Sequence, residues 1–216
     1  MRDGTIYNVE LSSGIKQTIM ESHSDGEVWG LSVADQDIVL TTCDDNKIKA
    51  WSISQRKCVY MGTVSNEAHS LKRRGASTLS TLADSQCARA ISYNPDNGHV
   101  AVGHNDGTLS IRAGIKDLEK VIHHNRHSKE WIEVIRYSPD GQKLAVGSHD
   151  NKIYIYDTTN YTLLGTCDKH NSFIVSVDWS LDGRFIRSVC GAHELLFFDA
   201  NTYHQYTNGA SNTTNT

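Results

Sequence analysis

An imidazole, a hydroxyl, a carboxylate and an indole follow one another near the start of the chain, as His23, Thr41, Asp45 and Trp51. These residue types can perform nucleophilic catalysis, with Thr41 as the nucleophile, His23 as its base and Asp45 orienting the base. No oxyanion-hole motif or nucleophile elbow accompanies them, and so a structural relay is favoured. In such a relay the imidazole bonds to both the carboxylate and the hydroxyl, and the hydroxyl meets the indole N–H. Each bond spares a buried polar group a penalty of about 1–3 kcal/mol.

Three further histidines, His123, His124 and His127, raise the question of a metal site. Imidazole is a good zinc ligand, but no thiol or carboxylate falls at metal spacing beside these residues. We interpret this run as a solvated connection between structural units. The chain also lacks a phosphate-binding glycine loop, an HExxH helix and paired catalytic carboxylates. The sequence therefore predicts no enzyme, no cofactor and no metal ion.

The densest basic cluster is formed by Lys72, Arg73 and Arg74. It is either a solvated loop tip or a contact for an acidic protein surface, and both interpretations stay open. The segment from Arg74 to Ser77 also matches a basophilic kinase pattern, which makes Ser77 a candidate phosphorylation site. A phosphate there would offset the local positive charge.

One repeated unit must position all of these residues: an apolar strand, a tight turn, a second strand, an Asp-centred turn and a third strand. The third strand of each copy ends at an aromatic residue or its substitute, and these ends lie 42, 61, 44 and 42 residues apart, at Val9, Trp51, Arg112, Tyr156 and Phe198. A spacing of roughly 40–45 residues is typical of a four-stranded propeller blade. The one long interval contains a polar, Ser/Thr/Ala-rich insertion. The sequence thus predicts an all-β protein, a WD-repeat β-propeller of about four blades plus a leading half-blade.

These repeats divide the chain into seven predicted segments. They are the end strands of a preceding blade, a first blade, an insertion loop, three further blades and a polar tail, at residues 1–22, 23–64, 65–82, 83–125, 126–168, 169–206 and 207–216. The relay is complete only in the first blade. The turn aspartate remains as Asp106 and Asp150 but becomes Ala192, and the hydroxyl position holds Val102 and Val146. We expect packing to replace hydrogen bonding in the later blades.

Composition limits the partners. Hydrophobic residues make up 38% of the chain and charged residues 21%, which is enough apolar surface for a core. The formal net charge of −4 does not draw the surface to nucleic acid or anionic lipid, so neither is expected as a partner. The N-terminus lacks the apolar stretch of a signal peptide, and five widely spaced cysteines suit reduced thiols. We expect a cytoplasmic protein.

Two segments carry a more specific resemblance. GSHDNKIYIYD (Gly147–Asp157) and HNSFIVSVDWS (His170–Ser180) resemble the EMAP-like proteins, the echinoderm microtubule-associated protein family, and the similarity extends from about residue 3 to residue 200. The resemblance implies two fused propellers, of which this chain is similar to part of the second, seven-bladed one. It also implies tubulin or microtubules as the partner, and a location on the cytoskeleton, with cytoplasmic and ciliary microtubules both open.

Length adds one expectation to this resemblance. A seven-bladed ring needs roughly 300 residues at the usual repeat length, more than the 216 present. The chain is therefore expected to form an incomplete, open part of a propeller that the remaining blades of a parent chain complete. The alternative function is a generic WD-repeat scaffold or adaptor that binds a non-tubulin protein across its propeller faces.

Overall fold

The computed structural model describes residues 6–20, 22–23, 26–64 and 86–207, and all regular structure in these ranges is β-strand. Within them no helix is long and apolar enough to span a membrane. The insertion predicted for residues 65–82 lies outside the described residues, and so does the tail except for Thr207.

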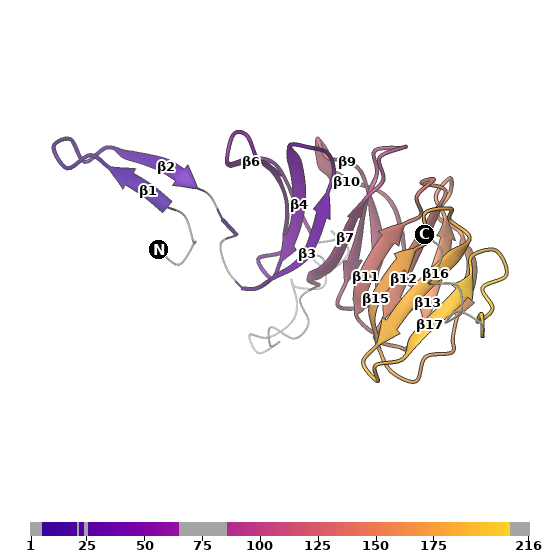
Figure 1. Ribbon diagram of the computed structural model, residues 1–216. Coiled ribbons are helices and arrows are strands. Elements are labelled where there is room, and N and C mark those ends of the chain that lie inside the picture. The colour runs from indigo at the N-terminus through magenta and orange to yellow at the C-terminus, as the bar shows by residue number, and fades with distance from the viewer. Residues whose placement is uncertain (1–5, 21, 24–25, 65–85, 208–216) are drawn as a thin grey trace, which may run out of the picture.

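A two-stranded hairpin comes first, and four antiparallel sheets follow it along the chain (Figure 1). The hairpin consists of β1 (Ile6–Val9) and β2 (Lys16–Met20). Blade 1 contains β3 (Val28–Val33), β4 (Ile38–Cys43), β5 (Lys47–Ser52) and β6 (Lys57–Thr63). Blade 2 contains β7 (Ala88–Tyr93), β8 (Val100–His104), β9 (Leu109–Gly114) and β10 (Asp117–Asn125).

The last two sheets follow the same meander. Blade 3 contains β11 (Ile132–Tyr137), β12 (Lys143–Ser148), β13 (Ile153–Asp157) and β14 (Leu163–Cys167). Blade 4 contains β15 (Ile174–Trp179), β16 (Phe185–Cys190) and β17 (Leu195–Asp199), and one isolated bridge joins Phe198 to Gln205 where a fourth strand would pair. The predicted all-β propeller of four blades with a leading half-blade is confirmed.

Glycine closes the tight turn between the first two strands in three blades. Gly98, Gly141 and Gly183 adopt φ values of 76°, 64° and 69°, in the left-handed region that L-residues with a side chain rarely enter. In blade 3, Asp140 accepts hydrogen bonds from the Ser138 hydroxyl at 2.6 Å and from a backbone N–H. Turns that contain Asp and Gly, at residues 95–98, 139–141 and 181–183, thus recur between the first and second strands of these blades.

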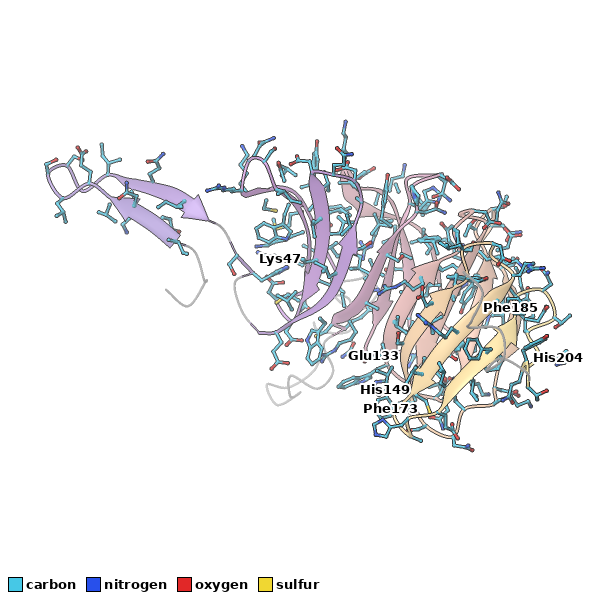
Figure 2. The ribbon with its side chains drawn as sticks, viewed as in Figure 1. Lys47, Glu133, His149, Phe173, Phe185 and His204 are labelled. Carbon is cyan, nitrogen blue, oxygen red and sulfur yellow. The ribbon has the colours of Figure 1, made fainter. Side chains whose placement is uncertain are left out.

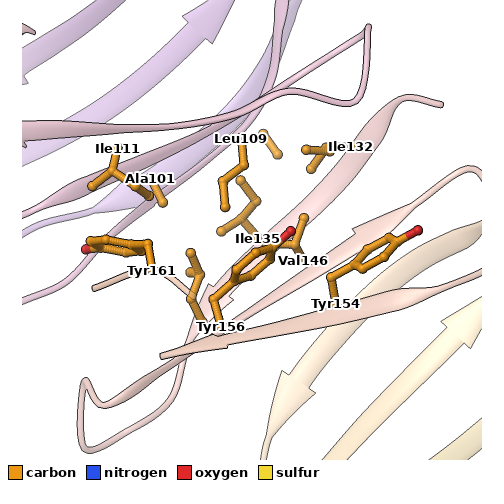
Figure 3. Packing of buried hydrophobic residues seen from close by; sticks show 11 residues of the cluster. Ala101, Leu109, Ile111, Ile132, Ile135, Val146, Tyr154, Tyr156 and Tyr161 are labelled. Atoms are coloured by element: carbon orange, nitrogen blue, oxygen red, sulfur yellow. The ribbon is translucent and has the colours of Figure 1, made fainter. Parts of the chain in front are cut away.

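The core lies between the blades, not within any one of them. Each sheet packs its face on the next, and a separate cluster of buried apolar side chains fills each of the three interfaces. Figure 3 shows the cluster between blades 2 and 3, to which blade 2 contributes Leu109 and Ile111 and blade 3 contributes Ile135 and Tyr156. Tyr156 is 2% exposed although it replaces the tryptophan of blade 1. Stability therefore depends on neighbouring blades, as in other repeat proteins.

Two glycines at one position of the repeat let adjacent blades approach. A Cβ on Gly103 would lie 2.3 Å from Cγ2 of Ile132, and a Cβ on Gly147 would lie 2.6 Å from Cγ2 of Ile174. Each isoleucine belongs to the first strand of the following blade. The missing side chain therefore makes room for the next blade.

The two end blades leave apolar side chains uncovered. On β3, Leu31 and Val33 are 62% and 66% exposed, and on blade 4 Val175 and Leu195 are 46% and 52% exposed. Blades 1 and 4 lie at opposite ends of the row in Figure 1. The arrangement is an open arc with two uncovered faces.

Replacing Gly147 with alanine tests the close approach of the blades. The new methyl group would clash with Ile174 and Val134, so we expect a loss of about 1–3 kcal/mol in the free energy of unfolding. The measurement is the urea midpoint of the variant against the unchanged chain. Leu181→Ala, at a side chain 93% exposed, is the control and should change stability by less than about 0.5 kcal/mol. Equal midpoints for both variants would contradict the packing argument.

Candidate functional site

The structure brings His23, Thr41, Asp45 and Trp51 together in blade 1. His23 Nδ1 lies 2.9 Å from Asp45 Oδ2, and His23 Nε2 lies 2.7 Å from Thr41 Oγ1. Trp51 donates its indole N–H to the same Thr41 oxygen at 2.7 Å. With the Nδ1 proton directed to Asp45, Nε2 accepts the hydroxyl proton of Thr41 and every group is satisfied. Thr41 is 9% exposed, and its oxygen is engaged by both His23 and Trp51.

Burial controls the charge state of this relay. Desolvation lowers the pKa of His23 below its ordinary value, and the carboxylate of Asp45 opposes that shift. The imidazole is therefore neutral at pH 7, as the hydrogen-bond pattern requires.

The turn aspartates of blades 2 and 3 make different bonds. Asp106 accepts the backbone N–H of Thr108 at 2.9 Å, and Asp150 accepts the hydroxyl of Tyr154 at 2.6 Å. In blade 2 His104 Nε2 lies 2.8 Å from the Ser110 hydroxyl. Both aspartates thus hold their own turns, and within the described residues neither makes a hydrogen bond to a histidine.

Blade 4 retains the link from imidazole to hydroxyl. His170 Nε2 lies 2.7 Å from Ser188 Oγ, and both side chains are buried. The expectation that packing replaces hydrogen bonding throughout the later blades was wrong here. The sequence signal was present, because His170 and Ser188 are 18 residues apart, as are His23 and Thr41. It was missed because Ala192 stands at the position of the turn aspartate.

The predicted histidine run lies at the join between blades 2 and 3. His123 packs on the ring of Tyr161 with a centroid distance of 5.6 Å, and His127 Nδ1 lies 3.0 Å from the hydroxyl of Tyr156. His124 is exposed on β10. These imidazoles face different neighbours and do not converge on one point.

A row of stacked side chains runs across all four blades at one edge. We call Trp29, Arg89, Trp131, His149 and Phe173 the aromatic row. The Arg89 guanidinium lies between two indoles, 3.9 Å from the ring centre of Trp29 and 4.5 Å from that of Trp131. The stack continues from Trp131 to His149 at 5.4 Å and from His149 to Phe173 at 4.7 Å.

The aromatic row is open to solvent and has acidic neighbours. Trp29, Trp131 and Phe173 are 41%, 39% and 40% exposed, unusually high for large aromatic side chains. Asp44 accepts the indole N–H of Trp29 at 2.8 Å, and Glu133 lies 3.1 Å from His149 Nε2. Figure 2 shows Glu133, His149 and Phe173 gathered at the same edge of the blades. Rigid, exposed aromatics with fixed polar neighbours are typical of a protein-binding surface.

Lys72, Arg73, Arg74 and Ser77 lie outside the described residues. The connection that contains them leaves β6 at Thr63, which pairs with Lys47 beside the Asp45 turn, and returns at Ala88, next to Arg89. Both of its ends are therefore at the edge that carries the aromatic row.

Thr41→Val tests the relay of blade 1. The change removes the shared oxygen and leaves the Trp51 N–H and His23 Nε2 without their partner, so unfolding should cost about 1–3 kcal/mol less. The control is Thr159→Val, which alters an exposed threonine in a turn. Equal urea midpoints for the two variants would show that the relay contributes nothing.

Stability should fall in acid because of His104. Full burial lowers the pKa of His104 to about 3, whereas the unfolded chain protonates this residue at about 6.5. Between these values the unfolded chain binds a proton that the folded chain does not, so stability decreases by up to about 1.4 kcal/mol per pH unit as pH falls. Above pH 6.5 the contribution is constant. Urea midpoints measured from pH 7 to pH 4 should fall less steeply in His104→Gln than in the unchanged chain; parallel slopes would refute this.

Comparisons with known proteins agree with the propeller fold. Residues 28–216 match the family model described as the echinoderm microtubule-associated protein second beta-propeller. Over its whole length, the chain is 54% identical to the ciliary WD repeat-containing protein ctxp80 of Euplotoides octocarinatus, and the match covers 30% of the length of that protein. Over 94% of its length, the chain is 33% identical to the 77 kDa echinoderm microtubule-associated protein of Strongylocentrotus purpuratus, and the match covers 27% of the length of that protein.

A human relative is similar at a comparable level. Echinoderm microtubule-associated protein-like 3 of Homo sapiens is 34% identical over 91% of this chain and 20% of its own length. The chain thus spans less than a third of the length of each of these relatives. A family model covering nearly all of the blades, together with these relatives, shows that the chain belongs to the echinoderm microtubule-associated protein family and corresponds to part of its second β-propeller.

Proposed function

We propose that this chain is a non-catalytic segment of a microtubule-associated protein and binds tubulin through its propeller surface. The observation that carries the proposal is the match of residues 28–216 to the second propeller of this family. Relatives are named as microtubule-associated proteins and as a ciliary WD-repeat protein, which favours a cytoskeletal location in the cytoplasm or the cilium.

The edge with the aromatic row is the proposed contact face. Exposed indoles and Phe173 supply apolar contact area there. The connection that contains Lys72, Arg73 and Arg74 begins and ends at the same edge, so its positive charge can meet the acidic surface of tubulin. Aromatic contacts and basic side chains would then act on the same partner.

We further propose that the remaining blades of a parent chain cover the two ends of the arc. Leu31 and Val33 at one end, and Val175 and Leu195 at the other, are the kind of side chains that blades 2 and 3 bury between them. Two findings support this: the chain matches part of a propeller family, and it covers less than a third of the length of its relative ctxp80. The aromatic row lies at an edge and stays accessible when the ends are covered.

Co-sedimentation with purified microtubules tests the proposal. The chain should pellet with microtubules, and Lys72→Ala, Arg73→Ala and Arg74→Ala together should weaken binding by about tenfold at low salt, because three cations near an acidic surface are lost. The phosphate mimic Ser77→Glu should weaken it in the same direction. The matched control removes three exposed cations at the outer edges of blades 1 and 2, Lys57, Lys116 and Lys120, and should bind as the unchanged chain does. Failure of the parent protein to pellet would refute tubulin binding.

A second candidate function is that of an adaptor for a non-tubulin protein, and the aromatic row favours it. Trp131 and Phe173 are suited to a protein contact whatever the partner. Purified microtubules separate the two candidates, since an adaptor of this kind stays in the supernatant when no other protein is present. Trp131→Ala should weaken microtubule binding if tubulin is the partner, while Tyr206→Ala, an exposed aromatic away from the row, should not.

A further inference from the structure

Blades 1 and 4 carry the same arrangement of potential metal ligands. His23, Cys43 and Asp45 gather in blade 1, and His170, Cys190 and Glu194 gather in blade 4, with the ligand atoms of each group within 4.8 Å of one another. The histidine and the cysteine are 20 residues apart in both groups. The two groups differ in how the carboxylate meets the histidine, and this difference decides which one can hold an ion.

The group in blade 1 is closed by its own hydrogen bonds. His23 Nδ1 lies 2.9 Å from Asp45, and Nε2 lies 2.7 Å from Thr41. Both ring nitrogens therefore have partners, and a metal ion would have to break the relay to enter. We assign no ion to this position.

The group in blade 4 is open at the corresponding point. The nearest carboxylate comes from Glu194, two residues after Ala192, and its Oε2 lies 3.7 Å from His170 Nδ1. That nitrogen is buried and makes no hydrogen bond within the described residues, although the His170 side chain is 0% exposed. Burying a nitrogen without a hydrogen bond costs free energy. A cation bound by this nitrogen together with the thiol and the carboxylate would remove that cost.

The neighbours of these ligands already hold them in place. Ser188 Oγ lies 2.7 Å from His170 Nε2. When Nε2 carries the ring proton, the lone pair of Nδ1 is left to bind a metal ion. The backbone N–H of Asn171 donates to Glu194 Oε2 at 3.0 Å and orients the carboxylate. Such partners behind the ligands are characteristic of metal sites.

The distances suit zinc. Zinc bonds of about 2.0–2.3 Å in a tetrahedron place ligand atoms about 3.3–3.8 Å apart. The Cys190 thiol donates a hydrogen bond to Glu194 Oε2 at 3.3 Å, which zinc would replace, and His170 Nδ1 lies 3.7 Å from the same oxygen. Thiolate, imidazole and carboxylate are ligand types that zinc accepts, and the partly exposed Glu194 leaves room for a water as the fourth ligand.

We propose that blade 4 binds one zinc ion through His170 Nδ1, Cys190 Sγ and Glu194 Oε2. Binding releases the thiol proton of Cys190 to solvent. The ion joins the segment before β15 to the end of β16 and to the turn before β17. In blade 1 the relay of His23, Thr41 and Asp45 joins the corresponding segments. The ion holds the segments of blade 4 together, in a blade that has only three strands and one isolated bridge among the described residues.

Metal content of the purified 216-residue chain tests the site. After equilibration with zinc chloride and removal of unbound ion, we expect close to one equivalent of zinc per chain by mass spectrometry. Cobalt substitution should give a thiolate-to-cobalt absorption band, and zinc should raise the melting temperature. Zinc at background level in the unchanged chain would overturn the proposal.

Matched variants locate the ion. Cys190→Ser should abolish the cobalt–thiolate band and reduce zinc to background, whereas Cys43→Ser, at the equivalent position of blade 1, should retain both. Glu194→Gln changes a partly exposed side chain and keeps the fold measurable. It should weaken zinc binding by about tenfold or more, since changing even a residue behind a ligand typically costs that much. Loss of zinc in Cys43→Ser, or unchanged affinity in Glu194→Gln, would overturn the assignment.

Discussion

Face-to-face packing of neighbouring blades is the constraint on which the rest of this structure depends. A single four-stranded sheet here cannot bury both of its apolar faces, and the three buried clusters all lie between sheets. Gly103 and Gly147 allow the close approach, because a Cβ at either position would overlap an isoleucine of the next blade. The aromatic row exists only because of this packing, since its members come from different blades. A change that separates two blades would therefore also disrupt the proposed contact face.

The sequence predicted the parts of the fold that repeat. Strand order and the turns that contain Asp and Gly could be predicted because each recurs at one phase of the repeat and each has a local physical cause. Tyr156 and Phe198 could be aligned with Trp51 although the residue type differs, because all three stand one residue before the end of the third strand. Local signals of this kind survive substitution.

The candidate site was less accessible to prediction. Trp29 and Arg89 are 60 residues apart, and Arg89 and Trp131 are 42 apart, so no local pattern indicates that they stack. They also occupy two different positions of the repeat, since Trp29 and Arg89 lie within a first strand and Trp131 precedes one. The bond between His170 and Ser188 could have been predicted from spacing. Ala192 breaks the pattern there, because a complete relay has an aspartate at that position.

Relays and the aromatic row share one edge of the propeller, which connects stability to binding. The Asp45 turn, which His23 and Thr41 stabilise, lies beside Asp44, and Asp44 holds the indole of Trp29. Hydrogen-bonded turns thus fix the direction of exposed aromatic side chains, and little side-chain freedom is left to lose when a partner binds. The opposite edge presents the turns at residues 95–98, 139–141 and 181–183, and its ring contacts form separate short runs, such as His99 with Tyr161 and Arg184 with Phe185.

Hydrogen exchange of the parent protein with and without microtubules tests most directly whether this edge contacts tubulin. The account predicts that microtubules slow exchange in the backbone around Trp29, Arg89, Trp131 and Phe173, while the turns at residues 95–98 and 139–141 exchange at an unchanged rate. Protection of those turns instead, or no protection at either edge while the protein is bound, would contradict it.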